Sequence, residues 1–383
     1  MKITIVLGAF LPVPPIMGGA IEKAWFTLAQ EFVRRGHEVV VVSRAVAQFP
    51  REEILDGVRH IRVRGFDTPR SLLWLKFLDL IYSVRARSIL PRADILVTNT
   101  FWLPILLPNS NSGQVYVHVA RYPKGQMRLY RRVARLQAPS NAVARAVAME
   151  APRLEKKITV IPYPAPTAVA KSEPPAINLR EKIILFVGRV HPEKGVHLLV
   201  KAFASQARTV FADWKLMIVG PVEERFGGGG ESYLTSLKDL AAGVSDRVLF
   251  AGPVFDSTKL EQALRAARLF AYPSLAERGE SFGLAPLEAM TQGCAVLVSD
   301  LECFRDFIHD GETGFIFNHR SADADDALGK RMKRIIVDEA CLAAVAAAGH
   351  QRSARYSLPR VADQFLSDFD SLLRNSDVSD SDR

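Results

Sequence analysis

Two carboxylates, Glu280 and Glu288, flank a short turn and are separated by seven residues. The turn between them begins with Ser281, Phe282, Gly283 and Leu284. We expect Glu280 in a loop and Glu288 inside the helix that follows it, so the amides of the turn lie at a helix amino end, where a phosphate is stabilised. The carboxylates can accept hydrogen bonds from sugar hydroxyls. Paired acids at a helix start also occur as capping residues, and this alternative stays open for the pattern alone.

Two cations, Arg189 and Lys194, stand five residues apart in the segment 188–195, directly after an apolar run over 183–187 that predicts a strand. Cations on the loop at the carboxyl end of a strand can converge on one diphosphate and neutralise the charge that grows on a leaving phosphate. An exposed turn with incidental cations is the alternative.

In the first half of the chain, Gly18 and Gly19 follow a proline-rich loop and precede a helix expected from Ala20. This arrangement predicts either a backbone anion site at a helix amino end or a tight turn that needs positive φ. His118 lies at the end of a strand expected over 115–119. An isolated histidine in a strand is most often a core residue with satisfied nitrogens.

Strands and helices alternate twice along the chain, which predicts two doubly wound α/β units. In the first unit the expected strands are 3–7, 38–43, 95–98, 115–119, 136–139 and 158–161, with helices over 20–35 and from 141. In the second unit the expected strands are 183–187, 216–219, 248–250, 269–272 and 295–298, with helices over 196–204, 233–241, 259–267 and 283–292.

Domain boundaries follow from composition, because five prolines and few apolar residues occupy 162–175. A chain of 383 residues also exceeds the size at which one core remains favourable. We expect a first domain over 1–165, a linker over 166–180, a second domain over 181–355, a helix over 356–375 that could pack back on the first domain, and a disordered Ser/Asp-rich tail over 376–383. Ligands of such sheets bind at the carboxyl ends of the strands.

The net charge is +9, and six cations with no acid fall within residues 121–135. Nucleic acid, an anionic membrane or a phosphorylated lipid would suit this run, as would a solvated helix face. The three cysteines, at positions 294, 303 and 341, are too scattered for a disulfide framework or a metal site, which favours a reducing compartment. The uncharged stretch 3–21 contains too many prolines for a membrane span.

The segments around both charge pairs resemble the retaining glycosyltransferases of family 4, which have the GT-B fold. Residues 280–290 resemble the family element E-G/S-F-G-L-x-x-x-E-A-M, and 188–195 resemble G-R-x-x-x-x-K-G. The resemblance implies two Rossmann-like domains facing across a cleft. It also implies a UDP- or GDP-linked sugar donor, retention of anomeric configuration, and no cofactor or metal.

The resemblance assigns roles residue by residue. Arg189 and Lys194 would contact the diphosphate, Glu280 the donor sugar and Glu288 the ribose. Ser281, Phe282, Gly283 and Leu284 would bind the donor from the second domain, and Gly18 and Gly19 from the first. His118 would lie near the transferred sugar, with Arg121, Tyr122 and Lys124 near the acceptor. The chain departs from the family at 300–304, where a glycine-rich loop is usual.

We expect the acceptor to be a glycolipid or polysaccharide precursor, as in lipopolysaccharide synthesis. The basic run and the apolar stretch 72–78 suggest a cytoplasmic enzyme that is peripheral on the inner face of the plasma membrane, although 72–78 could equally be a core helix. Nucleic acid is disfavoured, because few aromatic residues interleave the arginines. The alternatives are an epimerase or phosphorylase of the same fold, or a non-catalytic module that binds nucleotides or polyanions.

Overall fold

The computed structural model describes residues 1–383 except 70, 108–111, 167–172 and 382–383, and the side chains from 376 onward are also outside the description. The chain divides into two compact units. The first domain comprises Met1–Pro166 and Tyr356–Arg383, and the second comprises Thr167–Arg355.

The first domain is built on a sheet that has eight strands among the described residues, in the order β3-β4-β2-β1-β5-β6-β7-β8. β3 pairs antiparallel with β4, and the other neighbours are parallel. The strands are β1 (Lys2–Val6), β2 (Glu38–Arg44), β3 (Glu52–Leu55), β4 (Val58–Val63), β5 (Ile95–Thr98), β6 (Gln114–His118), β7 (Arg135–Ala138) and β8 (Ile158–Val160).

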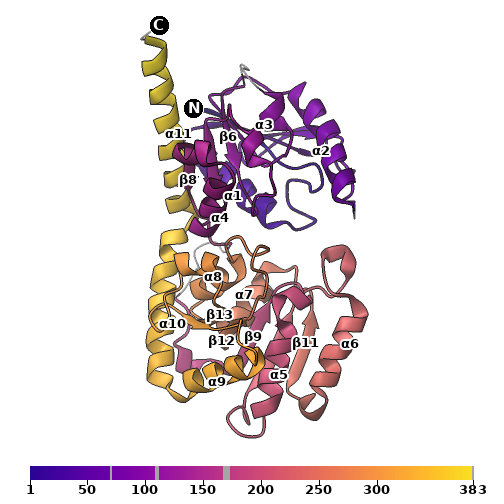
Figure 1. Ribbon diagram of the computed structural model, residues 1–383, viewed down its shortest axis with the longest axis vertical. Coiled ribbons are helices and arrows are strands. Elements are labelled where there is room, and N and C mark those ends of the chain that lie inside the picture. Colours follow the sequence, from indigo (N-terminus) through magenta and orange to yellow (C-terminus); the bar gives the residue numbers. More distant parts are fainter. Residues whose placement is uncertain (70, 108–111, 167–172, 382–383) are drawn as a thin grey trace. The chain divides into compact units, whose positions relative to one another are not determined.

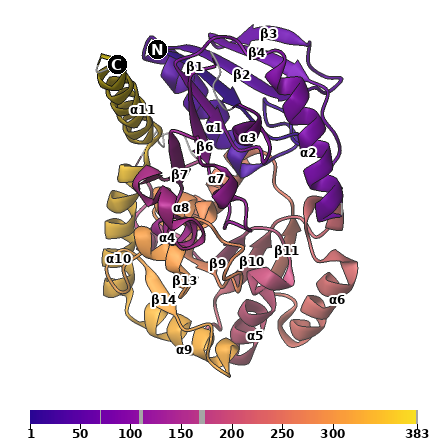
Figure 2. The ribbon, with the colours of Figure 1, turned by 45° about the horizontal axis from the view of Figure 1, so that its top comes forward.

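Helices cover both faces of this sheet (Figures 1 and 2). Alternate residues of a strand point to opposite faces, so Ile3 and Ile5 pack with α1 (Ala20–Arg34) and α11 (Leu358–Ser381). Val40 and Val42 face the other side, where α2 (Leu72–Arg87), α3 (Leu103–Leu106) and α4 (Asn141–Glu150) lie. Because both faces of the sheet are buried, the sequences of its strands are nearly continuous hydrophobic runs.

The second domain has an all-parallel sheet in the order β11-β10-β9-β12-β13-β14. Its strands are β9 (Glu181–Val187), β10 (Lys215–Val219), β11 (Val248–Gly252), β12 (Ala267–Tyr272), β13 (Ala295–Ser299) and β14 (Phe315–Phe317). Its helices are α5 (Val196–Gln206), α6 (Gly230–Leu240), α7 (Ser257–Ala266), α8 (Leu284–Thr291), α9 (Ala324–Val337) and α10 (Glu339–Ser353). Because β9 and β12 are neighbours, the loops that follow them meet at one edge of the sheet.

The expected linker over 166–180 includes residues that the structure assigns to the second domain. Residues 167–172 of it lie outside the described residues, but the short helix η3 (Ile177–Leu179) and Arg180 already belong to the second domain. Arg180 is buried and donates to the carbonyl oxygens of Gln292 and Ala267. A side chain that is held in this way fixes the backbone that carries it.

Two further differences concern the first domain. The expected strands omitted the hairpin β3–β4. Helix α11 continues to Ser381, so it includes most of the tail that was expected to be disordered. The same helix packs against α1, and its residues Phe365 and Phe369 are buried in the first-domain core.

Candidate active site

A buried ion pair joins the loops that follow β9 and β12. Lys194 ends the short helix η4 (Pro192–Lys194), and its Nζ lies 2.7 Å from Oε2 of Glu280. The two side chains are only 8% and 11% exposed. The same carboxylate oxygen accepts hydrogen bonds from the hydroxyls of Tyr272, at 3.1 Å, and Ser274, at 3.5 Å. Glu280 is therefore held by three donors from two neighbouring strand ends.

The backbone brings these loops into direct contact. Gly195 follows Lys194 with a φ of 67°, and a Cβ at this position would collide with the carbonyl oxygen of Pro273. The amide of Leu275 donates to the carbonyl oxygen of Glu193 at 2.7 Å. Glycine is needed here both for the left-handed conformation and for the close approach.

Arg189 lies at the carboxyl end of β9, where its guanidinium group is partly exposed. It donates to the carbonyl oxygen of Gly227 at 2.8 Å and pairs with the carboxylate of Glu193. Burial raises the pKa of the Tyr272 hydroxyl, and Glu280 raises it further, whereas the positive charge of Arg189 lowers it. Arg189 thus acts electrostatically on the residue that holds Glu280.

The turn after Glu280 leads into α8 as expected. Gly283 is the residue before the helix, and Leu284 is its first residue. Phe282 is buried, whereas Ser281 and Glu288 are half-buried. Every donor-binding residue expected in the second domain therefore lies in the loop after β9 or in the segment from β12 into α8, and the structure brings Lys194 and Glu280 into contact.

Three residues at this edge were not assigned a role from the sequence. Tyr272 and Ser274 donate to Glu280, and their position at the end of β12, shortly before the segment 280–290, was the available signal. Cys303 is buried, and burial together with the nearby charge of Glu280 raises the pKa of its thiol well above its usual range. Its proximity to Glu280 could not be read from the sequence.

The loop that carries Glu280 is also fixed by residues that follow the carboxyl end of β14. Nε2 of His319 lies 2.9 Å from Oε1 of Glu277, and Arg320 donates to the other carboxylate oxygen at 2.9 Å. Hydrogen bonds from His319 and Arg320 lower the pKa of Glu277 against the opposing effect of burial. His319 and Arg320 are therefore positioning residues for this loop.

The first-domain candidates Gly18 and Gly19 both have positive φ, at 79° and 96°. A Cβ on Gly19 would collide with the carboxylate of Glu22, which therefore folds over the amino end of α1. Burial raises the pKa of Glu22, while its own backbone amide and the charge of Arg121 lower it. In this structure a carboxylate of the chain itself lies at the place expected for an external anion.

His118 ends β6 inside the first domain, where both ring nitrogens have partners. Nδ1 pairs with Oε1 of Gln137, and Nε2 lies 2.9 Å from the hydroxyl of Tyr163. Because the Gln137 amide donates to the carbonyl oxygen of Ile161, its Oε1 faces Nδ1 as an acceptor, so Nδ1 carries the proton. Burial lowers the pKa of His118 to about 4, so the ring is neutral near pH 7.

The residues expected near the acceptor differ in exposure. Arg121 and Lys124 are exposed, whereas Tyr122 is half-buried and packs against the first-domain core. Arg121 is linked electrostatically to Glu22 and to Tyr163. Gly19, Glu22, Arg121, Tyr163 and His118 thus form one connected region of the first domain.

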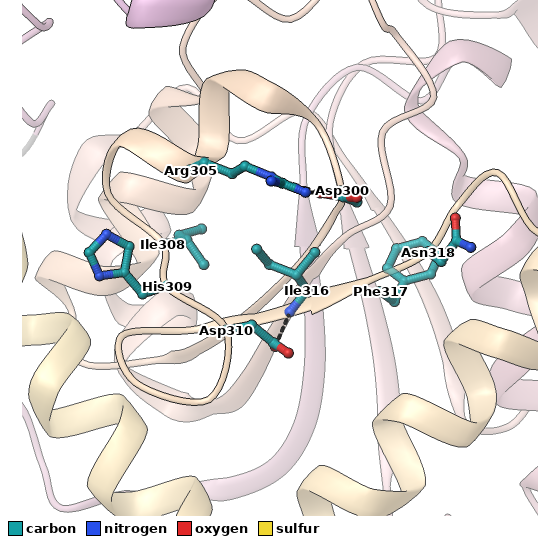
Figure 3. A pocket seen from close by; sticks show the side chains of 8 residues that line it. All are labelled: Asp300, Arg305, Ile308, His309, Asp310, Ile316, Phe317 and Asn318. Carbon is teal, nitrogen blue, oxygen red and sulfur yellow. Dashed lines mark hydrogen bonds and ion pairs between the residues drawn. The ribbon is translucent and has the colours of Figure 1, made fainter.

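A shallow pocket of about 450 Å³ lies beside β14 in the second domain, but its charges are already paired (Figure 3). Arg305 points to Asp300 and donates to it at 2.6 Å, while Asp310 accepts from the amide of Ile316 at 2.8 Å. The pocket contains neither Lys194 nor Glu280. Its lining residues are Asp300, Arg305, Ile308, His309, Asp310, Ile316, Phe317 and Asn318.

Among the described residues, no three His, Cys, Asp or Glu side chains converge as a set of metal ligands. In the same part of the chain, none of the helices combines the length and the apolar character needed to cross a bilayer.

Two family models match the chain, one in each half. The model described as Glycosyltransferase Family 4 matches residues 17–168, and the model described as Glycosyl transferases group 1 matches residues 170–352. The chain therefore belongs to the glycosyltransferases of family 4, as the resemblance of its motifs indicated.

Curated relatives align with part of this chain. The phosphatidyl-myo-inositol mannosyltransferase of Mycobacterium leprae is 33% identical over 187 residues, which are 48% of this chain and 45% of the relative. The D-inositol 3-phosphate glycosyltransferase of Nocardia farcinica is 39% identical over 153 residues, 39% of this chain and 32% of the relative. The alignments thus span half or less of the length of these relatives.

Solved structures match almost the whole chain at low identity, and they establish the fold. The sucrose-phosphate synthase of Thermosynechococcus elongatus has a TM-score of 0.79 at 20% identity and covers 98% of this chain and 100% of its own. The Anabaena Alr3699/HepE protein, solved with UDP-glucose, has a TM-score of 0.70 at 20% identity. The match covers 97% of this chain and 100% of the Anabaena chain. The expected fold class, GT-B with two Rossmann-like domains, is confirmed.

Proposed function

We propose that this protein is a retaining, metal-independent glycosyltransferase that transfers a sugar from a nucleoside diphosphate to a glycolipid or polysaccharide precursor. The observation that carries the proposal is the arrangement of Lys194, Glu280 and Arg189 around the ends of β9 and β12. Cations beside a carboxylate and a helix amino end suit a ligand that joins a diphosphate to a sugar.

The diphosphate is proposed to contact Lys194, Arg189 and the turn of Ser281, Phe282, Gly283 and Leu284. An ammonium group has three donors, so Lys194 can keep Glu280 and also bind a phosphate oxygen. Arg189 has five N–H donors, so it can bind the phosphate with those that Gly227 and Glu193 leave over, or exchange its pairing with Glu193 for it. Glu280 then accepts from hydroxyls of the donor sugar, and Glu288 accepts from hydroxyls of the ribose.

The reaction is proposed to proceed on one face of the sugar. The bond from the anomeric carbon to the phosphate oxygen breaks, and a bond from that carbon to the acceptor oxygen forms on the same side. The acceptor proton passes to the leaving phosphate oxygen, which needs no enzymatic base. Fixed positive charge from Arg189 and Lys194 stabilises the leaving diphosphate in place of a metal ion.

The first domain is proposed to supply contacts to the transferred sugar and the acceptor. His118 can accept from a sugar hydroxyl through Nε2 only if its hydrogen bond with Tyr163 is exchanged. Gly18 and Gly19 offer backbone amides once Glu22 moves from the amino end of α1. Arg121, Tyr122 and Lys124 are proposed as acceptor contacts, because Arg121 and Lys124 are exposed cations and Arg121 is linked to Glu22 and Tyr163.

The acceptor class is supported by the names of the mannosyltransferase relatives, which act on phosphatidyl-myo-inositol. A lipid-linked acceptor would be reached at the cytoplasmic face of the plasma membrane, so we infer an anionic membrane surface as a partner. The donor base is proposed to be uracil or guanine.

The test is a thermal-shift screen against nucleotide sugars, followed by a transfer assay with the ligand that binds. A ligand at about 100 times its dissociation constant adds about 2.7 kcal/mol to stability. Glu288→Ala should lose transfer while remaining folded. Conversion of the donor without any acceptor would favour an epimerase, and full transfer by Glu288→Ala would refute the proposed site.

A further inference from the structure

Helix α2 directs its apolar side outward. Leu73, Phe77, Leu80 and Val84 are spaced by four, three and four residues, so they form one stripe along the helix. Leu73 is 81% exposed, Phe77 51% and Val84 53%, and Leu80 is half-buried. Such a stripe on a helix of a soluble domain normally faces the core.

The opposite side of the helix contains polar groups that are buried. Asp79, Ser83 and Tyr82 are all inaccessible to solvent or nearly so. Asp79 accepts hydrogen bonds from the amides of Phe101, at 3.0 Å, and Trp102, at 3.2 Å. These contacts fix the rotation of α2, so the apolar stripe cannot turn inward without breaking them.

Aromatic side chains widen the exposed apolar surface. Trp74 is 58% exposed, and its ring centroid lies 5.6 Å from that of Phe77. We call the exposed set Leu73, Trp74, Phe77 and Val84 the α2 face. Single exposed apolar residues are ordinary, but a contiguous set of this kind marks a binding surface.

The surroundings of the α2 face are basic. From Ser71 to Arg87 the chain has three cations, Lys76, Arg85 and Arg87, and its only acid is the buried Asp79. Lys76 also connects the helix to the basic run, since its Nζ lies 4.7 Å from the ring centroid of Phe101. Phe101 in turn accepts a hydrogen bond from Tyr130 at 2.9 Å.

Exposed cations flank Tyr130 in the first domain, namely Arg128, Arg131 and Arg132, together with exposed Leu129. Glu150 accepts from the backbone amides of Gly125 and Met127, and Arg135, at the end of the run, pairs with Asp368. Apolar and aromatic side chains beside exposed cations match the interface of an anionic bilayer, where Trp lies at the headgroup level.

We propose that the α2 face inserts into the interfacial layer of an anionic membrane, with Lys76 and the cations around Tyr130 contacting lipid phosphates. The inference rests on the proposed function for its membrane-linked acceptor and names the surface that meets the membrane. Its test does not depend on catalysis.

The experiment is sedimentation of the full chain with phosphatidylcholine vesicles that do or do not contain phosphatidylglycerol. The unmodified protein should bind the anionic vesicles at low salt, and binding should weaken as salt screens the cations. Leu73→Ser with Phe77→Ser should lower the partition constant at least about tenfold. The matched control is Leu249→Ser with Phe255→Ser, because these residues are also exposed and lie in the second domain.

A second measurement follows the environment of Trp74. Its emission, taken as the difference between the unmodified protein and Trp74→Phe, should shift to the blue when anionic vesicles are added. The proposal is overturned if the unmodified protein ignores anionic vesicles, or if the α2 and control variants bind equally. Two other results would also overturn it: Trp74 shielded from quenchers in the absence of lipid, or an unmodified protein that is a dimer while the α2 variant is a monomer. In either case another protein surface would cover the α2 face. Donor binding by a protein that ignores vesicles would leave the proposed sugar transfer intact and would remove only the membrane partner.

Discussion

Nζ of Lys194 lies 2.7 Å from Oε2 of Glu280, although the two residues are 86 positions apart in the chain. Both side chains are about nine-tenths buried. Each charge depends on the other for compensation, since the desolvation of a lone buried charge is costly. The pair therefore links the stability of the second domain to its proposed donor site.

Removing one partner of this pair should destabilise the protein by about 3 kcal/mol, because the other charge is left buried and unpaired. Lys194→Ala and Glu280→Ala should each show this loss in urea unfolding. The double variant Lys194→Met with Glu280→Gln should recover part of it. The control is Lys182→Ala, whose exposed pairing with Asp213 should contribute less than about 1 kcal/mol. Equal losses at both pairs would contradict the burial argument.

Gly195→Ala should destabilise the protein by at least about 2 kcal/mol, because alanine resists the left-handed backbone and its Cβ would collide with the Pro273 carbonyl oxygen. Because this contact positions Lys194, donor affinity should fall as well. Gly243→Ala is the matched control, since a Cβ there has no neighbour within 4 Å. Thermal unfolding of both variants checks the prediction, and an unaffected Gly195→Ala protein would refute it.

Asp79 should make stability depend on pH. Burial raises its pKa to about 6, against the hydrogen bonds from the amides of Trp102 and Phe101. The folded protein therefore holds this proton more tightly than the unfolded chain, whose aspartate pKa is about 3.8. The free energy by which this proton stabilises the folded protein is fully present below about pH 3.8, and it is lost as the pH rises through about 6.

Asp79→Asn removes this titration. The stability of the variant relative to the unmodified protein should therefore increase by about 3 kcal/mol from about pH 4 to about pH 7. Urea unfolding at several pH values measures the difference. Asp246→Asn, at an exposed position, is the control for the substitution itself. If the difference in unfolding free energy between Asp79→Asn and the unmodified protein did not change with pH, the Asp79 carboxyl would be ionised in the folded protein without loss of stability, which would contradict the prediction.

The sequence predicted most of the architecture because buried parallel strands and the helices between them have distinct apolar patterns. The hairpin β3–β4 was missed for a physical reason. Its strands contain Glu53, His60 and Arg62, and the buried Arg62 pairs with Glu53 and donates to the carbonyl oxygen of Pro50. Such compensation depends on contacts that a hydropathy pattern does not contain.

The candidate site was predicted in part. The motifs identified Arg189, Lys194 and Glu280, but the ion pair, the hydroxyl of Tyr272 and the anchoring of Glu277 by His319 depend on contacts between distant segments. The outward rotation of α2 was equally inaccessible, because an apolar stripe has the same spacing whether it faces a core or a membrane. Contacts of the buried Asp79 decide between the two.

The central claim is that Arg189 and Lys194 bind the diphosphate of the donor, and calorimetric titration with UDP, GDP and inorganic pyrophosphate tests it most directly. Each charge-assisted hydrogen bond contributes about 1.5–3 kcal/mol, so Arg189→Ala should weaken binding of the preferred diphosphate by about 10- to 150-fold. Lys194→Ala, checked for folding by circular dichroism, should weaken it at least as much. Arg305→Ala, at the pocket beside β14, should bind like the unmodified protein. Unchanged affinity in the Arg189 and Lys194 variants, or no diphosphate binding by the unmodified protein, would contradict the claim.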